Sequence, residues 1–206
     1  MSTPQKALQR DESLESHSSR NRLTRIALIF YAAMTGVAVI WRVGLQGGPM
    51  FFTSVVERTA GLPWLRDGGI GIAAGLLVVW LSHLFTRRTD WGQNLARQLA
   101  AALGHLSLPQ CLLLAVASGI GEEFFFRGAL QPVVGLAWAS LLFGLMHIGP
   151  GRAWLPWTGF ALIMGVIFGA LFVLTGNLLA PVLAHAVING VNLPLLVRRY
   201  GAPSAS

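Results

Sequence analysis

Long apolar runs joined by short polar connections dominate the chain. Five are clear and a shorter one follows the third, so that the runs cover Ile26–Trp41, Gly68–Phe85, Leu108 to about Leu130, Leu136–Ile148, Trp154–Leu174 and Asn177–Val197. Most of them approach the ~20 residues that a helix needs to cross ~30 Å of hydrocarbon at ~1.5 Å per residue. The pattern predicts an all-α, polytopic membrane helix bundle with about six transmembrane helices.

A different periodicity separates the second and third long runs. Apolar residues recur there at helical spacing opposite polar ones, after a candidate cap at Thr89 or Asp90; they are Trp91, Leu95, Leu99, Leu103 and Leu106. A helix with one apolar and one polar face lies in the membrane interface rather than across it. We therefore predict an interfacial amphipathic helix on the cytoplasmic face, anchored by Trp91.

Composition supports a membrane protein. Hydrophobic residues make up 54% of the chain and charged residues only 11%, whereas a soluble domain carries roughly a quarter charged residues. The net charge of +7 comes from basic residues spread along the chain without a nucleic-acid-binding motif. It therefore indicates contact with the lipid bilayer and its anionic headgroups, and no nucleic-acid partner. The single cysteine, Cys111, excludes an intrachain disulfide.

The distribution of charge divides the chain and orients it. Residues 1–25 are polar and predict a disordered cytoplasmic tail, residues 26–200 a single transmembrane domain, and residues 201–206 a C-terminal tail. With six spans, the basic connections at Arg87–Arg88, Arg152 and Arg198–Arg199 fall on the side of the N-terminal tail. The positive-inside rule then places both termini of this cell-membrane protein in the cytoplasm.

Two adjacent carboxylates break the apolar pattern. Of the eight acidic residues, only Glu122 and Glu123 occupy an apolar run, while Glu57 and Asp67 are predicted to lie in a loop. Arg127 follows Glu123 at i+4, a spacing that also suits a plain ion pair on a helix surface. Three phenylalanines separate the two, however, and ionisable residues within a membrane span are costly and mark functional sites.

Two more polar pairs follow on later helices. His147 lies four residues after Phe143, and Asn189 four residues after His185, so the members of each pair share one helix face. Glu122 lies eight residues before Leu130, His147 eleven after Leu136, and His185 nine after Gly176. At ~1.5 Å per residue all three sit roughly 12–17 Å from the same bilayer face.

The shared depth of Glu122, His147 and His185 changes the interpretation of the two histidines. A lone histidine in an apolar helix is more often a packed residue than a catalytic one. One cavity would instead gather two histidines, two carboxylates, an arginine and an asparagine. Together they would provide a hydrolase with a base for water and donors for an oxyanion.

The three groups match sequence motifs. Glu122 to Gly128 fit EExxxR(G), Phe143 to His147 fit FxxxH, and His185 to Asn189 fit HxxxN. In this order they resemble the CAAX-processing and bacteriocin-processing (CPBP, or Abi) family of intramembrane endopeptidases, which includes the Ras-converting CAAX endopeptidase. The resemblance covers about residues 108–197. It implies hydrolysis of a peptide bond in a membrane-associated protein or peptide.

The resemblance also implies roles for single residues. Glu122 would be the general base, activating a water held jointly with His147, and His185 and Asn189 would donate to the oxyanion. The three remaining motif residues would support these four: Arg127 would compensate the extra charge of Glu123 and orient Glu122, and Phe143 would pack next to His147.

Whether a metal takes part is left open by the residues. Glu122, His147 and His185 are able to supply a His₂Glu zinc triad with an open fourth position. We favour a glutamate mechanism without a cofactor, because Asn189 suits an oxyanion donor better than a ligand and the chain has no HExxH pair.

Two non-protease classes compete with this interpretation. A proton-coupled transporter would also place Glu and His in spans, but it usually shows repeated halves, which this chain lacks. A non-catalytic membrane partner, such as an immunity protein, would not need all the motif residues. The predicted topology places the site nearer the non-cytoplasmic face, which favours substrates cleaved near a C-terminal membrane anchor.

Overall fold

The computed structural model describes residues 3–201, and side chains from residue 21 onward. The elements are α1 (Thr3–Val39), the π-helical η1 (Ile40–Leu45), α2 (Val55–Ala60), α3 (Trp64–Arg88), α4 (Asp90–Leu103), α5 (Leu108–Glu123), the π-helical η2 (Phe124–Leu130), α6 (Gln131–Leu145), the 3₁₀-helical η3 (Arg152–Trp154), α7 (Leu155–Thr175) and α8 (Leu179–Tyr200). Within these residues the chain forms no strand beyond one isolated bridge between Phe52 and Asn177. The predicted all-α bundle is confirmed.

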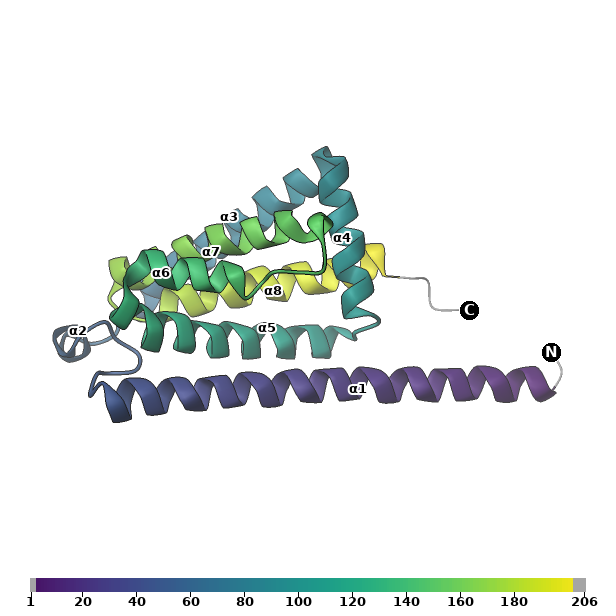
Figure 1. The fold of residues 1–206 in the computed structure, drawn as a ribbon, viewed down its shortest axis with the longest axis horizontal. Helices are drawn as coiled ribbons and strands as arrows, with labels where there is room; N and C mark the ends of the chain where they lie inside the picture. Colours follow the sequence, from purple (N-terminus) through teal and green to yellow (C-terminus); the bar gives the residue numbers. More distant parts are fainter. Residues whose placement is uncertain (1–2, 202–206) are drawn as a thin grey trace.

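Five helical segments of the described chain are long and apolar enough to cross a membrane: Asn21–Leu45, Trp64–Arg88, Leu108–Leu145, Arg152–Thr175 and Leu179–Tyr200. The prediction was about six, and the difference lies in the third segment. There the backbone leaves helical geometry at Gly135, with φ 80° and ψ 166°, and α6 runs back in the direction opposite to α5 (Figure 1). The ten residues from Leu136 to Leu145 span only ~15 Å, about half a bilayer, so α6 cannot cross one alone.

The N-terminal prediction was wrong for most of its length. Residues 1–25 were expected to be disordered, but helix α1 begins at Thr3 and continues into the first span. No glycine or proline occurs between Gln5 and Arg25, so nothing in this stretch ends the helix that the span begins. Residues 1–2 and 202–206, which include most of the predicted C-terminal tail, lie outside the described residues.

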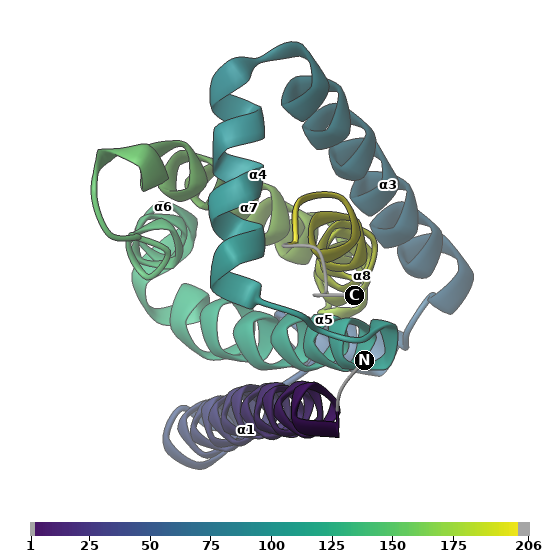
Figure 2. The same ribbon diagram turned by 90° about the vertical axis from the view of Figure 1, so that its right-hand side faces the viewer.

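Helix α8 occupies the centre of the bundle. It contacts α3, α4, α5 and α7, and Figure 2 shows it between α3 and α5. Small residues permit this packing: a Cβ atom on Gly75 of α3 would come within 2.9 Å of the Ala184 carbonyl oxygen, and one on Gly119 of α5 within 3.2 Å of the Ala186 nitrogen. Close approach at small residues is typical of membrane helix pairs. The helix that carries His185 and Asn189 is therefore held on several sides.

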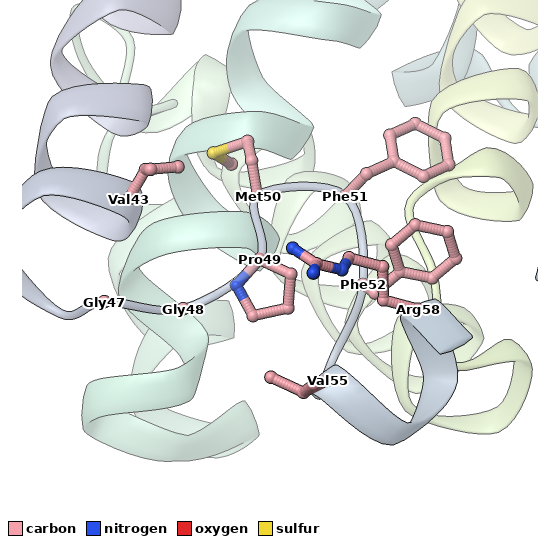
Figure 3. A pocket seen from close by; sticks show the side chains of 9 residues that line it. All are labelled: Val43, Gly47, Gly48, Pro49, Met50, Phe51, Phe52, Val55 and Arg58. Carbon is pink, nitrogen blue, oxygen red and sulfur yellow. The ribbon is translucent and has the colours of Figure 1, made fainter. Parts of the chain in front are cut away.

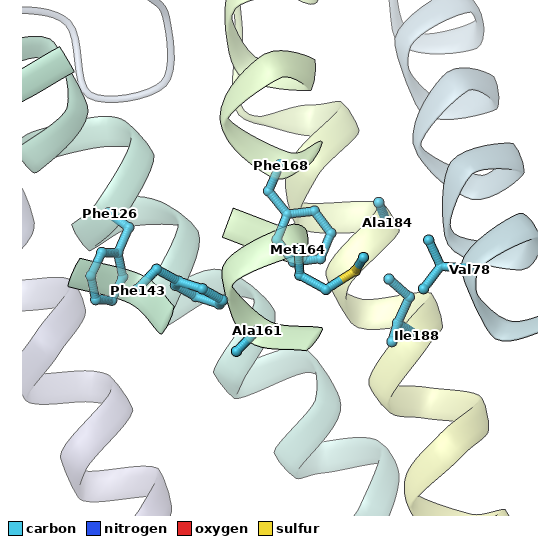
Figure 4. Close-up of a cluster of buried hydrophobic side chains, with 8 residues drawn as sticks. All are labelled: Val78, Phe126, Phe143, Ala161, Met164, Phe168, Ala184 and Ile188. Atoms are coloured by element: carbon cyan, nitrogen blue, oxygen red, sulfur yellow. The ribbon is translucent and has the colours of Figure 1, made fainter. Parts of the chain in front are cut away.

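A buried apolar cluster lies between α8 and its neighbours. Its members come from α3, η2, α6, α7 and α8 (Figure 4): Val78, Phe126, Phe143, Ala161, Met164, Phe168, Ala184 and Ile188. The outward faces are apolar as well, since Trp80 of α3, Leu113 of α5 and Leu174 of α7 are exposed. An apolar exterior around a packed core is what lipid requires. Together with the five candidate spans, it makes this a multi-pass membrane protein.

The basic connections gather at one end of the bundle. The N-terminal end of α1, the α3–α4 turn, the α6–α7 connection and the C-terminal end of α8 all lie toward the right of Figure 1. These segments carry the arginines whose grouping the sequence predicted: Arg87, Arg88, Arg152, Arg198 and Arg199. Helix α4 crosses the same end, and the Thr89 hydroxyl caps it by accepting from the Gly92 N–H at 3.1 Å. The predicted amphipathic helix thus forms.

At the opposite end, the loop before α2 is hydrogen-bonded to the α7–α8 turn. The Thr53 N–H donates to the Gly176 carbonyl and the Leu178 N–H to the Phe51 carbonyl, each at 2.9 Å. A cavity of about 370 Å³ lies in this loop (Figure 3), lined by residues 47–52 with Val43, Val55 and Arg58. None of the candidate catalytic residues lines it.

Asp67 is part of the same hydrogen-bonded connection. Its predicted position in a loop was wrong. It lies in the first turn of α3, fully buried, and accepts from the Asn177 amide at 2.6 Å and from Arg66 Nε at 2.7 Å. These two donors satisfy a carboxylate that would otherwise be costly to bury. The bond to Asn177 joins the start of α3 to the start of α8.

Candidate active site

Glu122 and Glu123 end helix α5 and are both buried, with 8% and 0% of their surface exposed. Arg127, in η2, is 1% exposed. Its Nη1 donates to Glu123 Oε1 and its Nη2 to the carbonyl oxygen of Gly165 in α7, each at 3.1 Å. The pair at i,i+4 is therefore an internal ion pair, not one on the helix surface.

Aromatic rings surround the Arg127 guanidinium. Its central carbon lies 4.3 Å from the ring centroid of Phe143, 5.4 Å from that of Phe168 and 5.8 Å from that of Phe126. Ring faces attract cations, most strongly away from water. The positive charge is thus stabilised by a carboxylate, a carbonyl and three rings. Phe143 contacts His147 as well as the arginine.

The hydrogen bonds of the two histidines define which ring nitrogen is available. His147 Nδ1 lies 2.7 Å from the Phe143 carbonyl oxygen, and His185 Nδ1 lies 2.8 Å from Glu123 Oε1. A carbonyl oxygen and an ionised carboxylate only accept, so each Nδ1 carries the proton. The Nε2 atom of each imidazole is left for chemistry.

Both Nε2 atoms face the same oxygen. Glu122 Oε2 lies 3.8 Å from His147 Nε2 and 4.0 Å from His185 Nε2, so the three residues meet as their matched depths predicted. Within residues 3–201, this oxygen accepts no hydrogen bond. The separations exceed those of direct hydrogen bonds, but one oxygen atom ~2.8 Å from Glu122 Oε2 is also able to reach either Nε2.

Asn189 is held by a residue that the sequence analysis did not single out. Its Nδ2 donates to Ser118 Oγ at 2.9 Å, and Ser118 in turn lies 3.2 Å from the Ala115 carbonyl, to which it donates. Ser118 precedes Glu122 by one helical turn, so the two share a face of α5. The amide nitrogen carries two hydrogens. One is used by Ser118, and the other is left for a further acceptor.

Two further residues at the site were also missed. Tyr31 of α1 packs against the residue before Glu122, since a Cβ atom on Gly121 would come within 3.1 Å of the Tyr31 Cβ. The Phe168 ring stacks on the His185 ring with centroids 4.9 Å apart and planes at 13°. Tyr31 had a sequence signal, because a tyrosine within an apolar run needs a partner for its hydroxyl. Phe168 had none, since its run contains several aromatic residues with no distinguishing spacing.

A bound zinc ion sets the spacing of its donor atoms. Tetrahedral zinc with bonds of ~2.0–2.1 Å to nitrogen brings neighbouring donor atoms to ~3.3 Å from one another. Glu122 Oε2 is 3.8 and 4.0 Å from the two Nε2 atoms. Among the residues that the structure describes, no three His, Cys, Asp or Glu side chains are arranged to hold a metal ion. As placed, Glu122 Oε2 lies farther from both Nε2 atoms than donor atoms on one zinc ion lie from each other.

Comparison with known proteins agrees with the motifs. Residues 103–191 match the family model described as type II CAAX prenyl endopeptidase Rce1-like. The chain is also 29% identical over 183 residues to the uncharacterized protein YpbD of Bacillus subtilis (strain 168), covering 82% of this chain and 84% of that protein. No solved structure matches. Residues 103–191, which carry all three motifs, are therefore similar to the Rce1-like CAAX prenyl endopeptidases.

Proposed function

We propose that this chain is an intramembrane endopeptidase in which Glu122 activates the water that attacks the peptide bond. One observation carries the proposal: Glu122 Oε2 accepts no hydrogen bond within residues 3–201 and faces two imidazole nitrogens at 3.8 and 4.0 Å. A general base needs a free lone pair within reach of the proton that it removes. Glu123 Oε2 also accepts no hydrogen bond in the described chain, but Arg127 and His185 hold Glu123 through its Oε1, whereas Glu122 faces the two Nε2 atoms.

The proposed reaction uses Glu122 and His147 together. The water donates one hydrogen to Glu122 Oε2 and the other to His147 Nε2, which has a lone pair because Nδ1 carries the proton. As the water oxygen bonds to the carbonyl carbon, Glu122 takes the proton and a tetrahedral intermediate forms. Glu122 then delivers that proton to the leaving nitrogen as the C–N bond breaks.

His185 and Asn189 complete the proposed mechanism as oxyanion donors. Because His185 Nδ1 donates to Glu123, its Nε2 is able to donate only when the ring is doubly protonated. Two carboxylates, Arg127 and the His185 imidazolium then sum to zero charge, which a buried site requires. Asn189 contributes the amide hydrogen that Ser118 leaves free.

The proposed substrates are membrane-associated proteins or peptides, cleaved close to the C-terminus. The basic end of the bundle, with both chain ends, would lie in the cytoplasm under the positive-inside rule. The site would then lie nearer the other face, within reach of C-terminal membrane anchors. Proteomics of a deletion strain should find membrane polypeptides that retain their terminal segment.

Glu122→Gln tests the base directly. The amide keeps the size of the side chain and removes its basicity, so cleavage of an internally quenched, prenylated CAAX peptide should fall by ~10²- to 10⁴-fold. Glu57→Gln, the same change at an exposed position in α2, should leave the rate unchanged. Full activity of Glu122→Gln in folded protein would refute the proposal.

Metal analysis separates the glutamate mechanism from a zinc mechanism. The purified protein should remain active after exhaustive treatment with 1,10-phenanthroline and should contain substoichiometric zinc by elemental analysis. Stoichiometric zinc, with activity lost on chelation and restored by the metal, would instead assign Glu122, His147 and His185 as ligands.

A further inference from the structure

Helices α5 and α8 make two polar contacts that lie one helical turn apart. The two helices contact each other and run in opposite directions (Figure 1). Glu122 Oε2 faces His185 Nε2 at 4.0 Å, and Ser118 Oγ lies 2.9 Å from Asn189 Nδ2. A step of four residues back on α5 therefore matches a step of four residues forward on α8, and residues four apart share a helix face. The contact between Ser118 and Asn189 thus continues the proposed active site by one turn.

The helices are closely packed around Ser118. A Cβ atom on Gly119 would come within 3.3 Å of the Val182 carbonyl oxygen, and one on Gly190 would lie 3.9 Å from the Ala115 Cβ. Glycines at such positions allow two helix backbones to approach closely. Ser118 itself is 5% exposed. Its hydroxyl is therefore held inside the contact between the two helices.

The hydrogen bonds of Ser118 decide which end of the Asn189 amide faces it. A hydroxyl has one hydrogen, and Ser118 Oγ donates it to the Ala115 carbonyl oxygen at 3.2 Å. Toward Asn189 the same oxygen is able only to accept. An amide nitrogen donates and an amide oxygen accepts, so the nitrogen of Asn189 has to face Ser118. The second hydrogen of that nitrogen then has a fixed direction in the plane of the amide.

We propose that Ser118 is a positioning residue for Asn189: by accepting one amide hydrogen, it fixes the nitrogen where the other hydrogen stabilises the oxyanion. The inference rests on the proposed function, in which Asn189 donates to the scissile carbonyl. The terminal torsion of an asparagine is broad and roughly two-fold. Without the Ser118 acceptor, the amide oxygen would take the place of the nitrogen for part of the time. An oxygen there repels an oxyanion, whereas a donor oriented in advance stabilises it.

Ser118→Ala tests this role, with Ser140→Ala as the matched control. Both serines are buried in helices, but Ser140 Oγ, in α6, has no hydrogen-bond partner within residues 3–201. On the prenylated CAAX peptide, Ser118→Ala should lower kcat by roughly 2- to 10-fold, the scale of one neutral hydrogen bond. KM should change little, because the oxyanion forms only in the transition state. Ser140→Ala should match the parent in both constants.

The effect of Ser118→Ala should depend on Asn189. Asn189→Ala alone should lower kcat by ~10²- to 10³-fold, the scale of losing one oxyanion donor. In the Asn189→Ala background, Ser118→Ala should change kcat by less than ~2-fold, since no amide is left to position. Equal fold-changes with and without Asn189 would overturn the proposal, and so would a Ser118→Ala variant with the kcat of the parent.

Unfolding in detergent measures the same contact without a substrate. Ser118→Ala should raise the unfolding equilibrium constant by about 5-fold in the parent, and by far less in an Asn189→Leu background, where the donor is absent. Equal effects in both backgrounds would contradict the proposal. If the effects differ while kcat of Ser118→Ala equals that of Ser140→Ala, the bond stabilises the fold alone, and the positioning role is wrong.

Failure of this inference is distinguishable from failure of the proposed function. If Glu122→Gln abolishes cleavage while Ser118→Ala behaves like Ser140→Ala, the base is correct and Ser118 does not position Asn189. If Glu122→Gln is fully active, the proposed function itself is wrong, and the positioning role falls with it.

Discussion

Replacing Arg127 by methionine should strongly destabilise the protein. The substitution keeps much of the side-chain volume but removes the partner of Glu123, which is fully buried. Breaking a buried ion pair from one side costs about 3–5 kcal/mol, because the remaining charge is left uncompensated. Loss of the bond to the Gly165 carbonyl and of the contacts with three rings acts in the same direction. We therefore expect loss of the charge alone to lower the free energy of unfolding by roughly 3 kcal/mol or more.

The double variant Glu123→Gln/Arg127→Met identifies the cause. It removes both charges, and a neutral replacement of a buried pair is often well tolerated, so the double variant should regain at least half of the lost stability. Unfolding would be followed by circular dichroism in mixed micelles with increasing denaturing detergent. Arg97→Met, on the exposed side of α4, should stay within about 0.5 kcal/mol of the parent. A single variant as stable as Arg97→Met, or a double variant no better than the single, would refute the reasoning.

Two further predictions concern the ends of the bundle. In a Cys111→Ser background, a cysteine at position 152 should be labelled from the same side as one near the N-terminus, and labelling from opposite sides would overturn the proposed topology. Asp67→Ala should lower the free energy of unfolding by about 1–3 kcal/mol, because the Asn177 amide loses its 2.6 Å acceptor; an unchanged unfolding transition would show that this bond contributes nothing.

Spacing alone predicted where the motif residues meet. Residues four apart share a helix face, and counting residues from each turn placed Glu122, His147 and His185 at one depth, where the structure has them. The count succeeds because a membrane segment must keep its backbone hydrogen bonds within a helix, and η2, although π-helical, is still one. What each of these residues does in catalysis is still a proposal.

Other features depend on information that a local pattern does not contain. The apolar run from Leu136 gives no sign that α6 is too short to cross alone, because hydropathy does not distinguish a spanning helix from one that packs along α7. The tail was predicted from polarity, whereas continuity with the first span decides its helical state. Tyr31 lies about ninety residues before Glu122, so only the packing of α1 on α5 brings the two together.

Helix geometry allows the two adjacent glutamates to face different partners. Successive residues of an α-helix project ~100° apart, so one carboxylate of the pair faces the imidazole Nε2 atoms while the other faces Arg127. His185 connects the two, with Nδ1 2.8 Å from Glu123 Oε1 and Nε2 4.0 Å from Glu122 Oε2. A change in the charge of Glu123 would therefore reach Glu122 through the protonation of a single ring. This coupling gives Glu123 and Arg127 an influence on the proposed chemistry, although both are buried behind it.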